Sequence, residues 1–260
     1  MTPEASHWIA VFDSGVGGIS VLRHLRRLLP QEQFLYYGDT ANAPYGSRPT
    51  EQVRELTLAA VQKLTEYCPL KALVVACNTA TAAAVKELRQ QYPELIVIGI
   101  EPALKLAADH FPHGHIGVMA TEVTLREEKF DTLLHRFDGS CTIAKIPAPG
   151  LVELVEAGKA DSKEAEALLQ NLLGSYAGKL DALVLGCTHY PFAAKAIRNV
   201  LGSGTQLLDG GEGTARETRR RLEQAGLLRQ GTGRVVLKSS AQEEGYPMAQ
   251  KLLEKDFSEE

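Results

Sequence analysis

The amino-acid sequence predicts an α/β fold built as two similar units that face each other across a cleft, each a mainly parallel sheet flanked by helices. Short apolar runs alternate with longer segments of helical periodicity, an order that is typical of parallel strands covered by helices. One local pattern occurs twice, as ALVVACNTATAAA at 72–84 and as ALVLGCTHYPFAA at 182–194. This repeat indicates a duplicated unit.

The expected strands follow one another along the chain with helical segments between them. In chain order they are WIAVFD at 8–13, FLYYGD at 34–39, ALVVAC at 72–77, LIVIGI at 95–100, HIGVMA at 115–120, CTIAKI at 141–146, ALVLGC at 182–187 and TQLLD at 205–209. Several of these runs end at, or next to, a polar or reactive residue: Asp13, Asp39, Cys77, Thr121, Cys187 and Asp209. The carboxyl ends of parallel strands are where open α/β sheets bind ligands, so we expect the site there.

The composition excludes several classes of function. The chain has 260 residues, of which 44% are hydrophobic and 23% charged, which is typical of a folded globule. A net charge of −4 gives no general attraction to nucleic acid or to an anionic membrane surface. The basic segment ARETRRRLEQ interleaves glutamates with its arginines, as a solvated helix face would. No apolar stretch approaches the roughly 20 residues that a membrane span needs. We therefore expect a soluble protein that binds neither nucleic acid nor membrane.

The N-terminal segment and the cysteines favour a cytoplasmic protein. The segment MTPEASHWIAVFDSG lacks the basic head and apolar run of a signal peptide, so export is not expected. No two of the four cysteines form a C-x-x-C pair, which argues against a disulfide framework or a zinc ribbon. Of these four we interpret Cys68 and Cys141 as structural.

Cys77 and Cys187 occupy the same point of the repeat, where an apolar run ends and a helix-like segment begins. Each could simply be a small buried residue that closes a strand. The duplication favours a functional interpretation, because Asn78-Thr79 and Thr188-His189 follow the two cysteines at matching positions. Two units packed about a pseudo-twofold axis would place the two thiols on opposite walls of the cleft.

Two facing thiols suit a reaction in which a substrate carbon loses a proton on one face and gains one on the opposite face. A thiol at a helix N-terminus is acidified by the helix dipole and by backbone N–H donors, so it can act as a thiolate base. A substrate with a carboxylate beside its reacting carbon would lose a proton to one thiolate and gain one from the opposite thiol. That reaction is racemisation or epimerisation. No P-loop, G-x-G-x-x-G or pyridoxal-phosphate lysine signature is present, so no cofactor is implied.

Five motifs in family order resemble the cofactor-independent glutamate racemases, which supply D-glutamate for bacterial peptidoglycan: FDSGVGG, YYGDTANAPYGSRP, ACNTATAAA, GIEPAL and GCTHYPF. The resemblance covers about residues 9–221. It implies two pseudosymmetric lobes, one made of residues 1–100 plus 213–260 and one of residues 101–212, with the active site between them. It also implies glutamate as the substrate and a homodimer as the assembly.

The resemblance assigns roles to individual residues. Cys77 and Cys187 are implied as the two acid/base thiols, Cys77 acting on D-glutamate and Cys187 on L-glutamate, with Asp13 and His189 as their respective partners. Glu156 resembles the acidic residue of the second lobe, although Glu153 lies on the same helical face. The implied substrate-binding positions are Asp13, Ser14, Tyr45, Gly46, Asn78, Thr79, Thr121, Thr188 and His189, with Asp39 as a further candidate.

Other interpretations remain open. Asp13, Ser14 and Asp39 could be caps, Tyr45 a turn aromatic, and Asn78 and Thr79 helix-start residues. His189 could be half of a metal site, but no other His/Cys cluster with ligand spacing supports one, so no metal is expected. For the whole chain, the alternatives are an aspartate racemase or another amino-acid racemase of the same family, a Cys187-His189 hydrolase, and a protein that binds an anion through DSGVGG.

Overall fold

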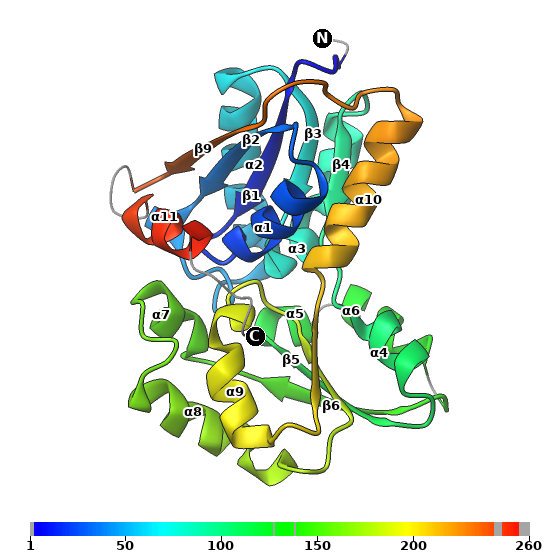
Figure 1. The fold of residues 1–260 in the computed structure, drawn as a ribbon, viewed down its shortest axis with the longest axis vertical. Coiled ribbons are helices and arrows are strands. Elements are labelled where there is room, and N and C mark those ends of the chain that lie inside the picture. The colour runs from blue at the N-terminus through cyan, green and yellow to red at the C-terminus, as the bar shows by residue number, and fades with distance from the viewer. Residues whose placement is uncertain (1–2, 127, 138, 242–245, 255–260) are drawn as a thin grey trace.

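The computed structural model describes residues 3–126, 128–137, 139–241 and 246–254, which form two parallel sheets flanked by helices (Figure 1). The first sheet has five strands in the order β4-β3-β1-β2-β9, and the second has four in the order β6-β5-β7-β8. The strands are β1 (Trp8–Asp13), β2 (Gln33–Gly38), β3 (Leu70–Val75), β4 (Ile96–Gly99), β5 (His115–Ala120), β6 (Thr142–Pro147), β7 (Ala182–Leu185), β8 (Gln206–Asp209) and β9 (Arg234–Ser239).

The two sheets repeat one arrangement, as the duplicated sequence pattern predicts. Every strand pairing between neighbours in the two sheets is parallel. When the second sheet is read in reverse, its order β8-β7-β5-β6 matches the order β4-β3-β1-β2 of the first. The strands β3 and β7 therefore occupy equivalent places. These are the strands that precede Cys77 and Cys187. The predicted fold class is therefore confirmed, and the two cysteines follow matching strands.

Helices cover both faces of each sheet (Figure 1). Those around the first sheet are α1 (Ile19–Leu28), α2 (Thr50–Tyr67), α3 (Asn78–Gln91), α10 (Gly211–Gln224) and α11 (Tyr246–Glu254). Those around the second are α4 (Leu104–His110), α5 (Glu122–Arg126), α6 (Glu128–His135), α7 (Leu151–Glu156), α8 (Lys163–Leu173) and α9 (Ala194–Leu201). Three short 3₁₀ helices complete the described elements: η1 (Thr40–Asn42), η2 (Gly174–Tyr176) and η3 (Tyr190–Ala193).

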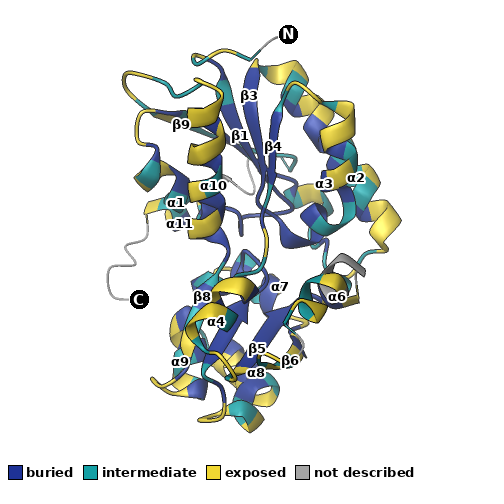
Figure 2. Ribbon diagram, turned by 90° about the vertical axis from the view of Figure 1, so that its right-hand side faces the viewer, coloured by how far each residue is buried: buried dark blue, intermediate teal, exposed yellow. Residues whose placement is uncertain are grey.

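The central strands β1, β3 and β7 are apolar along nearly their whole length because both faces of each sheet are covered. Successive residues of β1 point to opposite sides, so Ile9 and Val11 pack into one core cluster while Ala10 and Phe12 pack into another. The second sheet likewise lies between two clusters. Figure 2 shows dark, buried strands between helices whose outer faces are exposed. This burial fixes the sheets and therefore the edge at which the polar residues lie.

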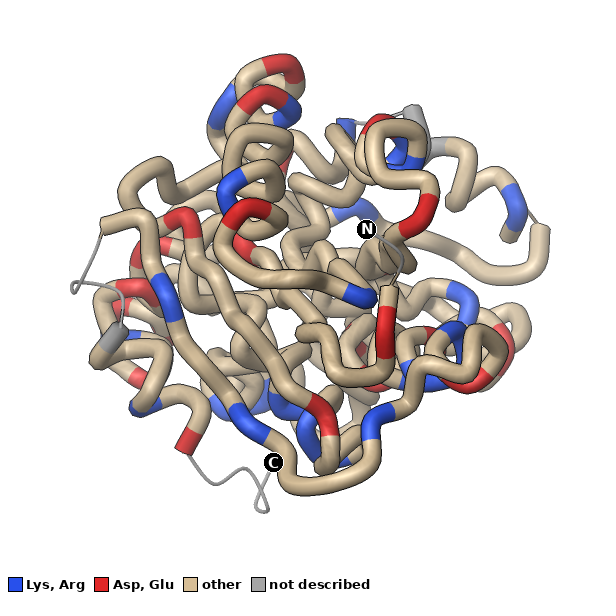
Figure 3. The backbone as a smooth tube through the Cα atoms, turned by 90° about the horizontal axis from the view of Figure 1, so that it is seen from above, with Lys and Arg blue, Asp and Glu red and all other residues tan. Residues whose placement is uncertain are grey.

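Charged residues of both signs are distributed around the outside of the molecule (Figure 3). On α10 the arginines of the basic segment pair with glutamates three or four residues away, for example Arg216 with Glu212 and Arg219 with Glu223. The predicted solvated helix face is confirmed. Within the described residues, no helix is both long enough and apolar enough to span a membrane.

Candidate active site

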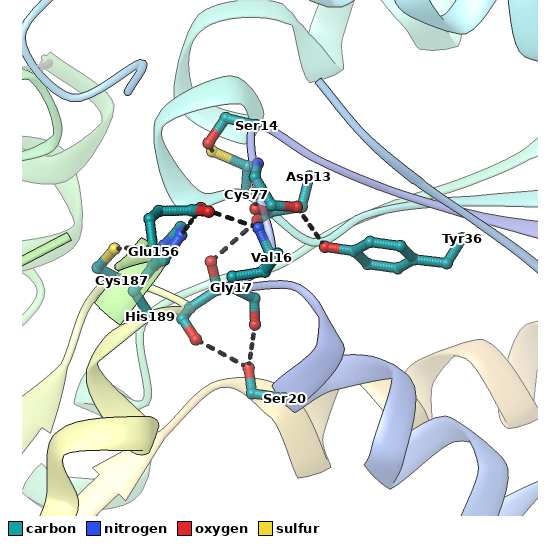
Figure 4. A network of polar contacts seen from close by, with 12 residues as sticks. Asp13, Ser14, Val16, Gly17, Ser20, Tyr36, Cys77, Glu156, Cys187 and His189 are labelled. Atoms are coloured by element: carbon teal, nitrogen blue, oxygen red, sulfur yellow. Dashed lines mark hydrogen bonds and ion pairs between the residues drawn. The ribbon is translucent and has the colours of Figure 1, made fainter. Parts of the chain in front are cut away.

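The predicted site residues gather where the carboxyl edges of the two sheets meet. Asp13 ends β1, Cys77 follows β3, and Cys187 follows β7. Figure 4 shows both thiols beside the loop after β1, with Glu156 and His189 between that loop and Cys187. Parallel strands place their carboxyl ends at one edge, which explains why residues so distant in sequence converge here.

Cys77 forms the N-cap of α3. Its Sγ accepts a hydrogen bond from Ala80 N at 3.4 Å and donates one to Ser14 Oγ at 3.6 Å. Burial, followed by the charge of Asp13, raises the pKa of the Cys77 thiol to about 12. The expectation of an acidified thiol is therefore wrong for Cys77, because a long N–H bond does not offset burial beside a carboxylate. Near neutral pH, Cys77 is a thiol.

Cys187 lies in different surroundings. The helix expected directly after it is absent, because a turn and the 3₁₀ helix η3, with Pro191 near its start, precede α9. Its Sγ is instead 3.7 Å from Nδ1 of His189, and both residues are buried. The second thiol thus has a basic side chain beside it where the first has a helix N-terminus.

His189 links Cys187 to Glu156. The Nε2 atom of His189 lies 2.6 Å from Oε1 of Glu156, the last residue of α7. Burial lowers the pKa of His189, but contacts with Cys187 and Glu156 outweigh it and raise the pKa well above its usual value. Burial raises the pKa of Glu156, yet the bond to His189 brings it below its usual value. The pair is therefore an imidazolium beside a carboxylate. Glu153 is exposed on the same helix, so Glu156 is the acid that reaches the site.

The loop after β1 contacts the carboxylates of both Asp13 and Glu156. Oδ1 of Asp13 accepts from Gly15 N at 2.8 Å and Oδ2 from Thr188 Oγ1 at 2.9 Å. Burial raises the pKa of Asp13, and the nearby charge of His189 opposes the rise. A Cβ at Gly15 would lie 1.9 Å from Glu156 Oε1, and one at Gly17 would lie 2.4 Å from His189 Nδ1. The glycines are required because the side chains of Glu156 and His189 pack directly on this loop.

Asp39, Tyr45 and Gly46 form an arm beside the site. The Tyr45 hydroxyl donates to Asp39 Oδ2 at 2.6 Å, and Asn42 donates to both oxygens of the same carboxylate. Tyr45 is buried against Phe12. A Cβ at Gly46 would lie 2.6 Å from Thr121 Cγ2, so the arm reaches the second sheet. Asp39 therefore anchors the arm that carries Tyr45 and Gly46, two of the predicted substrate-binding residues.

Three threonine hydroxyls meet where the two sheets approach each other. Thr79 Oγ1 is 3.2 Å from Thr121 Oγ1 and 3.3 Å from Thr124 Oγ1, and Thr121 donates to Thr124 at 3.0 Å. Thr124 was not among the predicted site residues; its place one helical turn from Thr121 was the signal available. Next to Thr79, both polar atoms of the buried Asn78 amide lack a hydrogen-bond partner among the described residues.

A buried cysteine follows the equivalent strand of each of two parallel sheets, which is the arrangement that the sequence predicts for a racemase. The family model for Asp/Glu/hydantoin racemases matches residues 14–218. A glutamate racemase of Clostridium botulinum is 42% identical over 250 residues, covering 95% of this chain and 96% of the relative. The chain belongs to the Asp/Glu/hydantoin racemase family, and within it to the glutamate racemases.

Solved structures agree with this assignment. Glutamate racemase isoform RacE1 from Bacillus anthracis superposes with a TM-score of 0.85 at 32% identity, covering 96% of this chain and 94% of that one. The Escherichia coli glutamate racemase, solved in complex with L-glutamate, gives a TM-score of 0.82 at 31% identity, with coverage of 97% and 96%.

Proposed function

We propose that this chain interconverts L- and D-glutamate by moving the α-proton between Cys77 and Cys187, with no cofactor. The observation that carries the proposal is the equivalence of the two cysteines, each buried and each following the matching strand of its sheet. A hydrolase built on Cys187 and His189 would have no use for Cys77 at the symmetric position. A protein that only binds an anion would have no use for either thiol.

The proton moves in two balanced steps. In the first, the Cys187 thiolate takes the α-proton of L-glutamate, leaving a carbanion whose charge spreads into the α-carboxylate. In the second, the Cys77 thiol delivers its proton to the opposite face, which gives D-glutamate, a Cys77 thiolate and a Cys187 thiol. The reverse reaction restores the starting state. Racemisation thus exchanges the roles of the two thiols.

The electrostatics of the site support Cys77 as the acid of the second step. Burial and Asp13 raise the pKa of Cys77 to about 12, so Cys77 begins as an acid. The His189 imidazolium lies beside Cys187, where Cys77 has the Asp13 carboxylate. In the proposed mechanism, each turnover of L-glutamate leaves the two thiols ready for D-glutamate.

Groups on the first lobe suit the α-ammonium group and the α-carboxylate of an amino-acid substrate. The buried Asp13 carboxylate suits the substrate's α-ammonium group, whose positive charge would also stabilise a Cys77 thiolate. The N-terminus of α3 and the unpartnered Asn78 amide suit a carboxylate. The Escherichia coli relative was solved in complex with L-glutamate, which favours glutamate as the substrate of this chain. Ser14, Tyr45, Gly46, Thr79, Thr121 and Thr188 complete the proposed binding site.

The proposal includes the biological setting. D-glutamate would serve peptidoglycan synthesis in the cytoplasm, and the active form would be a homodimer. The lobes would be residues 1–100 plus 213–260 and residues 101–212. This division is supported by α10 and β9, which return to the first sheet and pack on α1 and β2.

One assay tests the function. Purified protein should racemise D- and L-glutamate, followed by optical rotation or by a D-specific coupled reaction, with no added cofactor and with a chelator present. D- and L-aspartate serve as matched substrates. Faster racemisation of aspartate would favour the aspartate racemase alternative, and no racemisation of either amino acid would overturn the proposal.

A further inference from the structure

Tyr36 lies beside the candidate site and takes no part in the proposed proton path. It belongs to β2, and its side chain is fully buried among the groups that surround the two thiols. Its hydroxyl donates a hydrogen bond of 2.6 Å to the carbonyl oxygen of Gly15 (Figure 4). Burial, then the charges of Asp13, Glu156 and Cys77, raises the pKa of Tyr36 well above its usual value. The hydroxyl therefore stays protonated and remains a donor.

The Gly15 carbonyl shares a peptide group with the N–H of Val16. That N–H donates to Oε1 of Glu156 at 2.9 Å, and the same oxygen lies 2.6 Å from Nε2 of His189. Nδ1 of His189 then contacts the Cys187 sulfur at 3.7 Å. A continuous series of polar contacts thus runs from β2 of the first lobe to the thiol of the second.

The Gly15–Val16 peptide group links the hydrogen bond of Tyr36 to the position of Glu156. Because the amide is planar, a donor that fixes the carbonyl oxygen also fixes the direction of the N–H on the other side. A hydrogen bond at the oxygen also polarises the amide and strengthens its N–H as a donor. Gly15 itself offers little resistance to rotation of this peptide, since glycine has the widest range of backbone conformations.

We propose that Tyr36 is a positioning residue for the Cys187 half of the reaction, whose hydroxyl holds the Gly15–Val16 peptide against Glu156 and so keeps His189 beside Cys187. This inference rests on the proposed function. The path through Val16 and Glu156 leads to Cys187, while Cys77 is held by Ala80 and Ser14. Removing the Tyr36 hydroxyl should therefore slow proton transfer at Cys187 more than at Cys77.

The test is Tyr36→Phe, which keeps the ring and its packing, with Tyr37→Phe as the control from the same strand. We expect kcat/KM for glutamate to fall by about tenfold or more in Tyr36→Phe and to stay within about twofold of wild type in Tyr37→Phe. The melting temperature of each variant is measured first, and assays are run well below it. If Tyr36→Phe loses activity only to the extent that it unfolds, the proposal is overturned.

Isotope effects separate positioning from a general structural role. L-glutamate labelled with deuterium at Cα reports proton abstraction by Cys187, and the labelled D-enantiomer reports abstraction by Cys77. If Tyr36 acts on Cys187, the isotope effect on kcat/KM should rise for labelled L-glutamate and fall for labelled D-glutamate. Isotope effects that stay as in wild type, or a wild-type rate in Tyr36→Phe, would overturn this inference alone. A wild-type protein without racemase activity would overturn the proposed function and this inference together.

Discussion

At the scale of single residues, the two equivalent cysteines differ in the charge beside them. Cys77 has the Asp13 carboxylate nearby, whereas Cys187 has the His189 imidazolium, which Glu156 supports. A symmetric backbone thus carries two cysteines with opposite charges beside them. Two-step proton transfer requires one thiolate and one thiol, since two thiols or two thiolates could not move one proton between them.

Serine substitutions test the two thiols separately. A serine hydroxyl is far too weak an acid to act as a base near neutral pH, so Cys77→Ser and Cys187→Ser should each lose racemisation by at least about 10²–10⁴-fold. Racemisation is followed by optical rotation. Cys68→Ser and Cys141→Ser, at cysteines outside the site, serve as controls and should stay active.

The residual reaction distinguishes the two faces. In heavy water, Cys187→Ser should exchange the α-proton of D-glutamate and Cys77→Ser that of L-glutamate, because the remaining thiol still faces one enantiomer. Mass spectrometry of recovered substrate measures the exchange. Near-normal racemisation by Cys77→Ser would contradict the symmetric interpretation of the repeat.

The ion pair between His189 and Glu156 should make stability depend on pH. The pKa of His189 is raised above 6.5, so its contribution is complete below pH 6.5 and is lost as pH rises through the folded-state value. The pKa of Glu156 is lowered below 4.5, so its contribution is complete above pH 4.5 and is lost as pH falls through the folded-state value. Both contributions are present between these two limits.

Glu156→Gln should therefore lower the melting temperature most between pH 4.5 and 6.5. The difference from wild type should shrink above the pH at which His189 loses its proton. Thermal melts followed by circular dichroism across the pH range measure this. Glu153→Gln, an exposed position on the same helix, should show no such dependence. A difference between wild type and Glu156→Gln that is constant with pH would contradict the ion pair.

At the scale of elements, the loop after β1 packs so closely on the residues that follow β7 that no room is left for a side chain at Gly17. Ser20 Oγ donates to the carbonyls of both Gly17 and Thr188, and a Cβ at Gly17 would meet His189 and Thr188. Gly17→Ala should push the second lobe away and reduce kcat/KM by about tenfold or more, since displacements of about 1 Å can cost 10²-fold.

A second glycine provides the control for that change. A Cβ at Gly213, inside α10, would meet nothing within 4 Å. Gly213→Ala should leave kcat/KM unchanged and stabilise the fold by about 0.5–1 kcal/mol, because alanine is the better helix former. Activity assays and urea denaturation of both variants measure this. Equal activity in Gly17→Ala and Gly213→Ala would show that the Gly17 contact is not needed.

The sequence predicted the first eight of the nine described strands and missed the edge strand β9. The runs at 8–13 and 115–120 coincide with β1 and β5, because apolar runs in parallel sheets have clear ends. The edge strand β9 is half-buried, with an exposed Arg234 at its start, and so gave no apolar run. The η3 turn after Cys187 was also missed, since the repeat suggested a helix there.

In the site, the sequence predicted the two thiols and their side-chain partners Asp13, His189 and Glu156, but not Tyr36, which acts through a backbone carbonyl. The repeat singled out Cys77 and Cys187 because reactive side chains stand out in an apolar context. The role of Tyr36 depends on a bond to a backbone carbonyl 21 residues away, which no local pattern encodes. The pKa of Cys77 depends on burial and on Asp13, which only the packed structure brings together.

At the scale of the whole molecule, the candidate site and a buried ion pair lie at opposite ends of the first sheet. The candidate site lies at the carboxyl ends of the strands. Near the amino end of β3, Lys71 forms a fully buried ion pair of 2.6 Å with Glu32. Lys71 Nζ also donates to the carbonyls of Ala5 and Leu227, and Glu32 accepts from Arg229 N. This cluster joins the N-terminal segment, β3 and the segment that leads to β9.

Lys71→Met should destabilise the whole molecule without altering the site. Removing one partner leaves the Glu32 charge buried and unpaired, so the free energy of unfolding should fall by about 3–5 kcal/mol. Adding Glu32→Gln should restore much of that loss, because the unpaired charge disappears while an acceptor for Arg229 remains. Urea denaturation measures the change. Lys105→Met, which breaks the exposed pair with Asp109, should cost at most about 1 kcal/mol. The folded fraction of Lys71→Met should keep its kcat/KM for glutamate, and a large loss there would mean that the amino end of the sheet also sets the geometry of the thiols.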